Sequence, residues 1–180
     1  MEQTKKLLFV CSGNTCRSPL AKVLAESIFQ AEGLDGWEID SAGTAALHGM
    51  SASRQAMSAA SALELDLSAH QSKPLTPEAV ERADLVLVMT GAHKKAVLSL
   101  VPQAAGKVYT VAELAGAEGD IADPFGGSVA LYLEVARELQ THLKTIAKLL
   151  KANGLPRRES APGKEAAGRR EVKDENSTGQ

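Results

Sequence analysis

Apolar runs alternate with helical patterns over the first 150 residues of the chain. The runs predicted as strands are residues 6–10, 37–41, 85–89 and 107–110. The segments predicted as helices are residues 18–31, 53–62, a short stretch from 76, 92–100 and 128–150. This alternation indicates an α/β fold, here a three-layer sandwich with a four-stranded parallel sheet and helices on both faces. Right-handed crossovers place strand 1 centrally, with the loop after it at a switch point. The strand order that we expect is 2-1-3-4.

Local signals mark the starts of two helices and the buried face of the last one. Ser18 and Pro19 predict an N-cap and a first helical position, and Thr76 with Pro77 repeats the pattern. Apolar positions in the last helix step by four and three and form one stripe. The stripe consists of Tyr132, Ala136, Leu139, Leu143, Ile146 and Leu150.

The composition of the chain changes near residue 151. Residues 151–180 hold seven Lys or Arg and five Asp or Glu, with only Leu155 and Val172 as large apolar side chains. Such a segment cannot offset its ordering entropy by burial. We therefore expect a folded domain over residues 1–150 and a disordered, charged tail over residues 151–180.

Composition and charge disfavour several classes of protein. A chain of 180 residues suits one domain, and a net charge of −2 argues against broad nucleic-acid binding. Two cysteines and four scattered histidines give no disulfide framework or metal-ligand spacing, so no metal and no cofactor are expected. No apolar run approaches the roughly 20 residues of a membrane span. We expect a cytoplasmic monomer that binds neither membranes nor nucleic acid.

The loop between the first strand and the first helix carries the candidate chemistry. It begins with Cys11 and reaches Arg17 after five intervening residues. The N-terminus of the following helix suits an anion, and Gly13 would let successive amides curl into a nest. The loop lacks the Gly-Lys-Ser/Thr ending and the glycine spacing of nucleotide-binding loops.

Cysteine and arginine at the two ends of this loop suit phosphoryl transfer. The planar guanidinium of Arg17 can hold two phosphate oxygens. Its charge and the amide nest favour the thiolate of Cys11, which is then aligned for in-line attack on a bound phosphoryl group. The alternative interpretation is a buried structural cysteine beside a surface arginine.

Residues 11–19 resemble the active-site loop of the low-molecular-weight protein tyrosine phosphatase family. The resemblance continues at residues 41–43, 83–90 and 123–125, in the same order and spacing, and covers about residues 5–150. It implies that Cys11 forms a phosphocysteine intermediate and that Asp123 protonates the leaving group and later activates water. It further implies that phosphate and substrate contact Ser12, Gly13, Asn14, Thr15, Cys16, Arg17, Ser18 and Phe125.

The resemblance also implies roles for residues that support the loop. Asn14 would stabilise the loop with a bond from Ser41, Ser18 would hydrogen-bond the thiolate, and His70 would form a structural hydrogen bond. A disulfide between Cys11 and Cys16 would inactivate the enzyme reversibly, although Cys16 could equally be a small buried residue. The other histidines, at positions 48, 93 and 142, are expected to be solvated.

Two features resemble the bacterial protein arginine phosphatase branch of this family. Thr15 stands where tyrosine-directed members typically carry isoleucine, and Asp123-Pro124-Phe125 is followed by Gly-Gly-Ser. A threonine hydroxyl can meet the polar guanidinium of phosphoarginine, which isoleucine would leave unpaired. Phe125 would form one wall of the site. The prediction is a metal-independent phosphatase of phosphoarginine on proteins.

Three alternatives remain open at this point. A phosphotyrosine phosphatase on the same scaffold requires only that Thr15 be a neutral substitution. A thioredoxin-coupled arsenate reductase would need further cysteines, and none follows Cys16. A phosphate-binding or redox-sensing module without turnover would not need the complete set of Cys11, Arg17 and Asp123.

Overall fold

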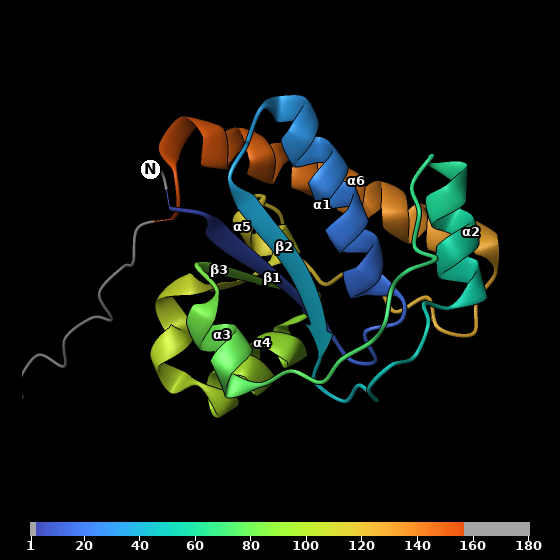
Figure 1. The fold of residues 1–180 in the computed structure, drawn as a ribbon, viewed down its shortest axis with the longest axis horizontal. Helices are drawn as coiled ribbons and strands as arrows, with labels where there is room; N and C mark the ends of the chain where they lie inside the picture. Colours follow the sequence, from blue (N-terminus) through green and yellow to red (C-terminus); the bar gives the residue numbers. More distant parts are fainter. Residues whose placement is uncertain (1–2, 157–180) are drawn as a thin grey trace, which may run out of the picture.

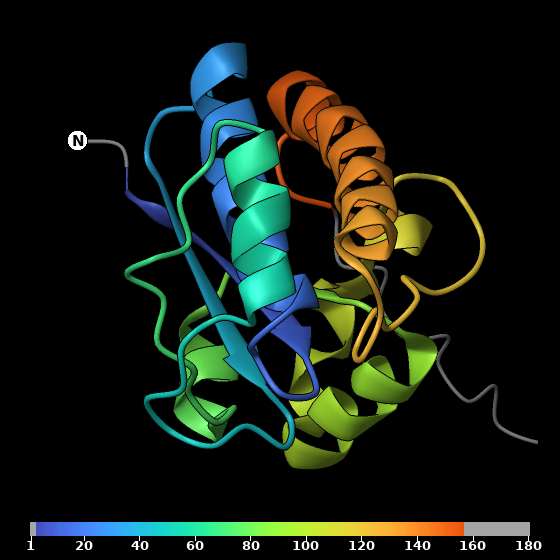
Figure 2. The ribbon, with the colours of Figure 1, turned by 90° about the vertical axis from the view of Figure 1, so that its right-hand side faces the viewer.

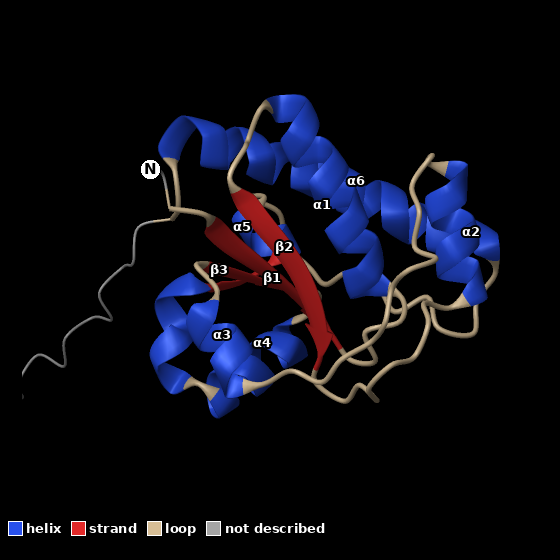
Figure 3. Cartoon of the chain, in the orientation of Figure 1, coloured by secondary structure: helices blue, strands red, loops and turns tan. Residues whose placement is uncertain are grey.

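A computed structural model describes residues 3–156 of the chain, which form a parallel sheet between two layers of helices (Figure 1). The strands are β1 (Lys5–Cys11), β2 (Trp37–Gly43), β3 (Leu85–Val88) and β4 (Val108–Thr110). Their order is β2-β1-β3-β4, and every pairing is parallel. The predicted strand order and three-layer architecture are therefore confirmed, with β1 in the interior of the sheet (Figure 3).

The alternation of side chains along β1 builds a separate core on each face of the sheet. Leu7, Phe9 and Cys11 belong to one buried cluster, whereas Leu8 and Val10 belong to the other. Period-two alternation sends successive side chains to opposite faces, so a strand covered on both sides is apolar throughout. This is why the sequence shows β1 as a continuous apolar run.

Helices cover both faces of the sheet (Figure 2). One layer contains α1 (Arg17–Glu32), α2 (Arg54–Ala62), α5 (Val111–Leu114) and α6 (Val129–Asn153). The other contains α3 (Pro77–Arg82), α4 (Gly91–Leu100) and the 3-10 helix η1 (Pro102–Lys107). The sequence did not predict α5 or η1, since helices of four and six residues are too short to show a repeating apolar face.

The predicted stripe of α6 is buried at all six positions. Ser128 caps the helix by accepting a hydrogen bond from the backbone N–H of Leu131, and the helix continues to Asn153, beyond its predicted end. The rest of the predicted tail, from residue 157, lies outside the described residues. Within residues 3–156, no helix combines the length and the apolar character that crossing a membrane requires.

The prediction that Ser18 caps α1 is wrong. The helix begins at Arg17 after Cys16, and no side chain caps this end. Pro19 therefore occupies the third helical position, where a missing N–H still costs no intrahelical hydrogen bond. Ser18 is inside the first turn, and its hydroxyl bonds to the side chains of Cys11 and Asn14.

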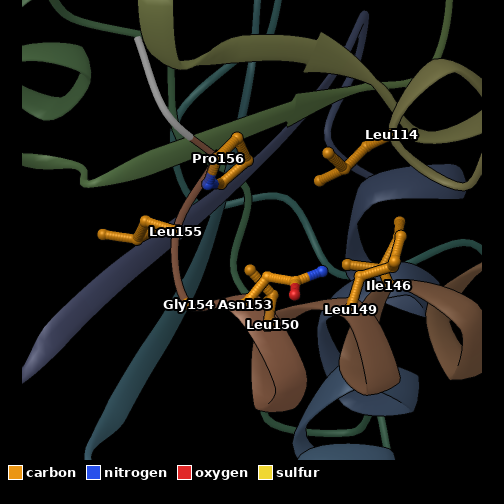
Figure 4. Close-up of a pocket in the computed structure, with 8 residues that line it drawn as sticks. All are labelled: Leu114, Ile146, Leu149, Leu150, Asn153, Gly154, Leu155 and Pro156. Atoms are coloured by element: carbon orange, nitrogen blue, oxygen red, sulfur yellow. The ribbon is translucent and has the colours of Figure 1, made fainter.

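An apolar cavity of about 550 Å³ lies between α5 and the end of α6 (Figure 4). Its lining consists of Leu114, Ile146, Leu149, Leu150, Asn153, Gly154, Leu155 and Pro156. The loop after β1 instead contacts the start of α6, through Tyr132. The cavity is thus at the opposite end of this helix from the candidate catalytic residues.

Candidate active site

The candidate nucleophile is the last residue of β1. Cys11 is buried, and its Sγ is 2.9 Å from the hydroxyl oxygen of Ser18 in the first turn of α1. The loop between them joins an interior parallel strand to a helix N-terminus, which is where open α/β sheets bind ligands. A hydroxyl at this distance can donate to a thiolate and stabilise its charge.

Asn14 connects the loop to three other segments and is fully buried. Its Nδ2 donates to the hydroxyls of Ser18 and Ser41, at 2.8 and 3.0 Å. Its Oδ1 accepts from the backbone N–H of Lys73 at 3.0 Å. The carbonyl oxygen of Asn14 is 2.6 Å from the ring Nε2 of His70. The predicted supporting residues Ser18, Ser41 and His70 thus all bond to one residue, the first two to its side chain and His70 to its backbone.

The left-handed residue of the loop is Asn14, not Gly13. Asn14 has a φ of 55°, whereas Gly13 is outside the left-handed region. Asparagine tolerates this conformation better than most residues, and its four hydrogen bonds hold it there. Beside this loop, packing requires a glycine at position 43 of β2, because a Cβ there would lie 2.3 Å from the carbonyl oxygen of Ser12.

Arg17 is a buried cation, with only 4% of its surface exposed. Its Nη1 donates to the carbonyl oxygen of Ile121 at 2.9 Å, and its Nη2 is 3.5 Å from Oδ2 of Asp123. Both contacts lie in the segment before α6, so Arg17 joins the two predicted catalytic loops. A guanidinium has five N–H donors, and these contacts leave others to bind an anion.

Asp123 is at the exposed edge of the site, with 55% of its side chain accessible. Its Oδ1 accepts from the backbone N–H of Phe125 at 3.1 Å, which fixes a turn after Pro124. Phe125 is 81% exposed, so this ring is available to an incoming substrate rather than packed in the core. The carboxylate is therefore near Arg17 yet open to solvent.

Thr15 and Cys16 are supported by α2 and α6. The carbonyl oxygen of Thr15 accepts from the backbone N–H of Ser53 at 2.9 Å. The Sγ of Cys16 is 3.2 Å from the hydroxyl of Tyr132 and 3.6 Å from that of Ser53. The thiol of Cys16 thus contacts α6 and the N-cap residue of α2, whereas the thiol of Cys11 contacts Ser18.

His93 is a residue of this site that the sequence did not identify. We expected it to be solvated, but only 6% of its surface is exposed. Its Nε2 is 2.8 Å from the hydroxyl of Ser12, and its Nδ1 is 3.0 Å from the hydroxyl of Thr90. Of the other two histidines, His48 is exposed as expected, whereas His142 is half-buried on α6 beside Glu138.

Burial changes the protonation of the two histidines that contact the loop. It is the largest cause of the lowered pKa of His70, and the nearby charges of Lys22 and Lys73 act in the same direction. Burial also lowers the pKa of His93, helped by the positive charge of Arg17. Both rings therefore favour the neutral form, which costs less to bury than an imidazolium.

Comparison with known proteins assigns this arrangement to a family. The family model of low molecular weight phosphotyrosine protein phosphatases matches residues 6–155. The chain belongs to that family. Its site combines a strand-terminal cysteine, a buried arginine and an exposed aspartate on the loop before the last helix. Within residues 3–156, no group of three or more Cys, His, Asp or Glu side chains is placed to hold a metal ion.

Relatives within the phosphatase family differ in their substrates. The protein-arginine-phosphatase of Bacillus subtilis strain 168 is 43% identical over 146 residues, covering 81% of this chain and 96% of that protein. The probable low molecular weight protein-tyrosine-phosphatase EpsP of Ralstonia nicotianae is 35% identical over 150 residues, covering 83% and 99%. A solved YwlE arginine phosphatase mutant with a phosphorylated active-site serine matches with a TM-score of 0.79 at 42% identity, covering 82% and 97%.

Proposed function

We propose that this chain hydrolyses phosphoarginine on proteins through a phosphocysteine intermediate. The observation that carries the proposal is that Arg17 connects Asp123 to the loop of Cys11, so that the three residues proposed as nucleophile, clamp and acid are linked through one site. The similarity to the arginine phosphatase of Bacillus subtilis supports phosphoarginine as the substrate. The substrates would be phosphorylated proteins, and the reaction would need no cofactor.

The first step transfers the phosphoryl group to Cys11. Arg17 and the backbone amides of residues 12–17 bind its oxygens. The Cys11 thiolate attacks phosphorus in line as the bond from phosphorus to the guanidinium nitrogen breaks. Asp123 donates a proton to that nitrogen, so the product leaves as an arginine side chain. The Ser18 hydroxyl, 2.9 Å from Sγ, stabilises the thiolate before attack.

The second step returns the free enzyme. Asp123, now deprotonated, accepts a proton from a water molecule whose oxygen attacks the phosphocysteine. The bond from sulfur to phosphorus breaks, inorganic phosphate leaves and the thiolate of Cys11 is restored. The same carboxylate therefore serves as acid and then as base, and its exposed position gives both the leaving group and water access to it.

The deciding experiment compares kcat/KM for peptides of one sequence that carry either phosphoarginine or phosphotyrosine, without added metal. We expect a preference for phosphoarginine of about 100-fold or more, worth roughly 2.7 kcal/mol in the transition state. Asp123→Asn should reduce kcat by about 10²–10⁴-fold, and Cys11→Ser should abolish turnover. Turnover that survives Cys11→Ser would disprove the phosphocysteine route.

A phosphotyrosine phosphatase is the second candidate function. The similarity to EpsP of Ralstonia nicotianae favours it, and so does the exposed ring of Phe125, which could pack against a phenol. A preference for phosphotyrosine peptides would select this function and keep the same nucleophile and acid. It would also mean that Thr15 is a neutral substitution rather than a substrate filter.

Three further expectations extend the proposal. The enzyme would act as a monomer, and it would act in the cytoplasm. A disulfide with Cys16 would protect the Cys11 thiolate from over-oxidation. Because the Cys16 thiol contacts Tyr132, this disulfide would require the Cys16 side chain to leave that contact. Mass spectrometry of peroxide-treated protein checks for the bond, and sulfinic acid at Cys11 would argue against it.

A further inference from the structure

Ser12 is the first residue after the proposed nucleophile, and its backbone and its side chain bond to two different segments of the chain. Its carbonyl oxygen accepts from the backbone N–H of Ala45 at 3.0 Å, in the segment that follows β2. Its hydroxyl is 2.8 Å from Nε2 of His93 on α4, which is 81 positions away in the sequence. The contacts of Asn14 hold the middle of the loop, so the contact between Ser12 and His93 is a separate attachment at the start of the loop.

The position of His93 is itself fixed by the first turn of α4. Thr90 caps this helix, and its Oγ1 contacts both the backbone N–H and Nδ1 of His93, at 3.2 and 3.0 Å. The backbone N–H of Gly91 donates to Oδ1 of Asp120 at 2.8 Å. The start of α4 is therefore attached to both loops of the active site.

Both ring nitrogens of His93 have partners, although the residue is almost fully buried. Burying an imidazole is favourable only when its polar atoms are satisfied. An apolar side chain would fill the same space without that requirement. The ring atom that faces away from its own helix bonds only to Ser12 among the contacts described, which links its burial to the loop.

We propose that His93 is a positioning residue that holds Ser12, and with it the first amide of the loop, in the conformation that binds phosphate. The inference rests on the proposed function only in that the loop must bind a phosphoryl group, whichever amino acid carries it. Since the loop is fixed before substrate arrives, losing His93 should weaken the binding of any phosphate and leave kcat nearly unchanged.

The test compares two uncharged replacements of different reach. His93→Gln places an amide near the position of Nε2 and can still bond to Ser12. His93→Asn can bond to Thr90 but is too short to reach the loop. Burial and Arg17 already lower the pKa of His93, so wild type and both variants are compared with an uncharged side chain at neutral pH.

Inorganic phosphate is the probe, and its protection of Cys11 against iodoacetamide gives a dissociation constant without turnover. Tandem mass spectrometry distinguishes Cys11 from Cys16 in the shared peptide. We expect the dissociation constant of phosphate to rise about five- to tenfold in His93→Asn, as for one lost hydrogen bond. In His93→Gln it should stay within about twofold of the wild-type value. KM for an aryl phosphate should rise by the same factor.

Ser12→Ala completes a double-mutant cycle and tests the proposal even if His93→Asn folds poorly. It should weaken phosphate binding by about the same factor as His93→Asn, and adding His93→Asn to it should change little. Two outcomes would show that His93 only packs α4. Either the two substitutions raise the dissociation constant of phosphate by factors that multiply in the double variant, or His93→Asn lowers the melting temperature and leaves phosphate binding unchanged. Absence of phosphate protection in the wild type would instead overturn the proposed function together with this inference.

Discussion

Asn14 shows how a single residue can define a catalytic loop. Its left-handed backbone turns the chain, and its side chain bonds to Ser18 and Ser41 while its carbonyl oxygen meets His70. Glycine would permit the same φ and keep the carbonyl oxygen that meets His70, but it would remove the side-chain hydrogen bonds to Ser18 and Ser41. The two requirements together explain why asparagine occupies this position, whereas Gly13 beside it has no positive φ to accommodate.

Substitutions at Thr15 separate the effects of its hydroxyl and of its size on substrate choice. Thr15→Val keeps the shape and removes the hydroxyl, whereas Thr15→Ile also adds a methylene. We expect Thr15→Val to lower kcat/KM for phosphoarginine peptides about tenfold, because the guanidinium loses a polar partner. Thr15→Ile should lower it further and raise kcat/KM for phosphotyrosine peptides. An unchanged ratio of the two substrates in both variants would exclude Thr15 as the filter.

Single residues were predicted well where the loop sequence itself carries the chemistry. The structure brings Cys11, Arg17 and Asp123 into one site, as the motif predicted, although their catalytic roles stay predictions until measured. His93 could not be identified in this way. Its contact with Ser12 depends on how closely α4 approaches the loop, and an isolated histidine in a helix carries no local signal of that distance.

Helices and strands were predicted best where a regular spacing of buried apolar positions continues over many residues. The stripe of α6 and the apolar runs of β1 and β3 repeat their pattern and are buried as expected. The start of α1 was misplaced because Ser18 and Pro19 fit an N-cap pattern that the active-site loop overrides. There, hydrogen bonds between side chains and the loop decide where the helix begins.

The close approach of β2 to the active-site loop gives a prediction at the level of elements. A Cβ at Gly43 would lie 2.3 Å from the carbonyl oxygen of Ser12 and 3.0 Å from the backbone nitrogen of Asn14. These are backbone atoms that cannot rotate away. Gly43→Ala should therefore displace the loop, lower the free energy of unfolding by about 1–3 kcal/mol and reduce kcat/KM more than tenfold.

Gly91→Ala is the matched control for that substitution. Gly91 begins α4, and the nearest atom to its added Cβ is 4.0 Å away, at Oδ1 of Asp120. This variant should keep full activity and be as stable as the wild type or slightly more so, because alanine restricts the unfolded chain. Urea unfolding and kcat/KM measure both variants, and equal behaviour of the two would contradict the proposed clash.

At the scale of the whole molecule, the sheet order explains why distant segments form one site. Parallel strands direct their carboxyl ends to the same edge, and right-handed crossovers put β1 between β2 and β3. Ser41 on β2, the loop after β1 and α4 after β3 therefore meet at that edge. The alternation of strands and helices predicted this topology, but the distances between these segments depend on packing that no local pattern contains.

The half-buried His70 and the buried His93 make the stability of the fold depend on pH. Burial lowers the pKa of His70 below its ordinary value of 6.5, so below that pH the unfolded chain binds a proton that the folded chain resists. The free energy of unfolding must then fall as pH decreases from 6.5 toward the lower folded value. His93 acts in the same direction. Glu26, whose pKa is raised by burial, acts in the opposite direction at lower pH.

His70→Gln isolates the contribution of His70 to the pH dependence of the free energy of unfolding, because glutamine can still donate to the carbonyl oxygen of Asn14 but does not titrate. Urea unfolding of both proteins between about pH 5 and 8 gives the difference between their stabilities, from which the contributions of Glu26 and His93 cancel. We expect the wild type to lose more stability than the variant as pH decreases through 6.5 and the two curves to run parallel above it. Parallel curves over the whole range would mean that His70 titrates alike in the folded and unfolded chain.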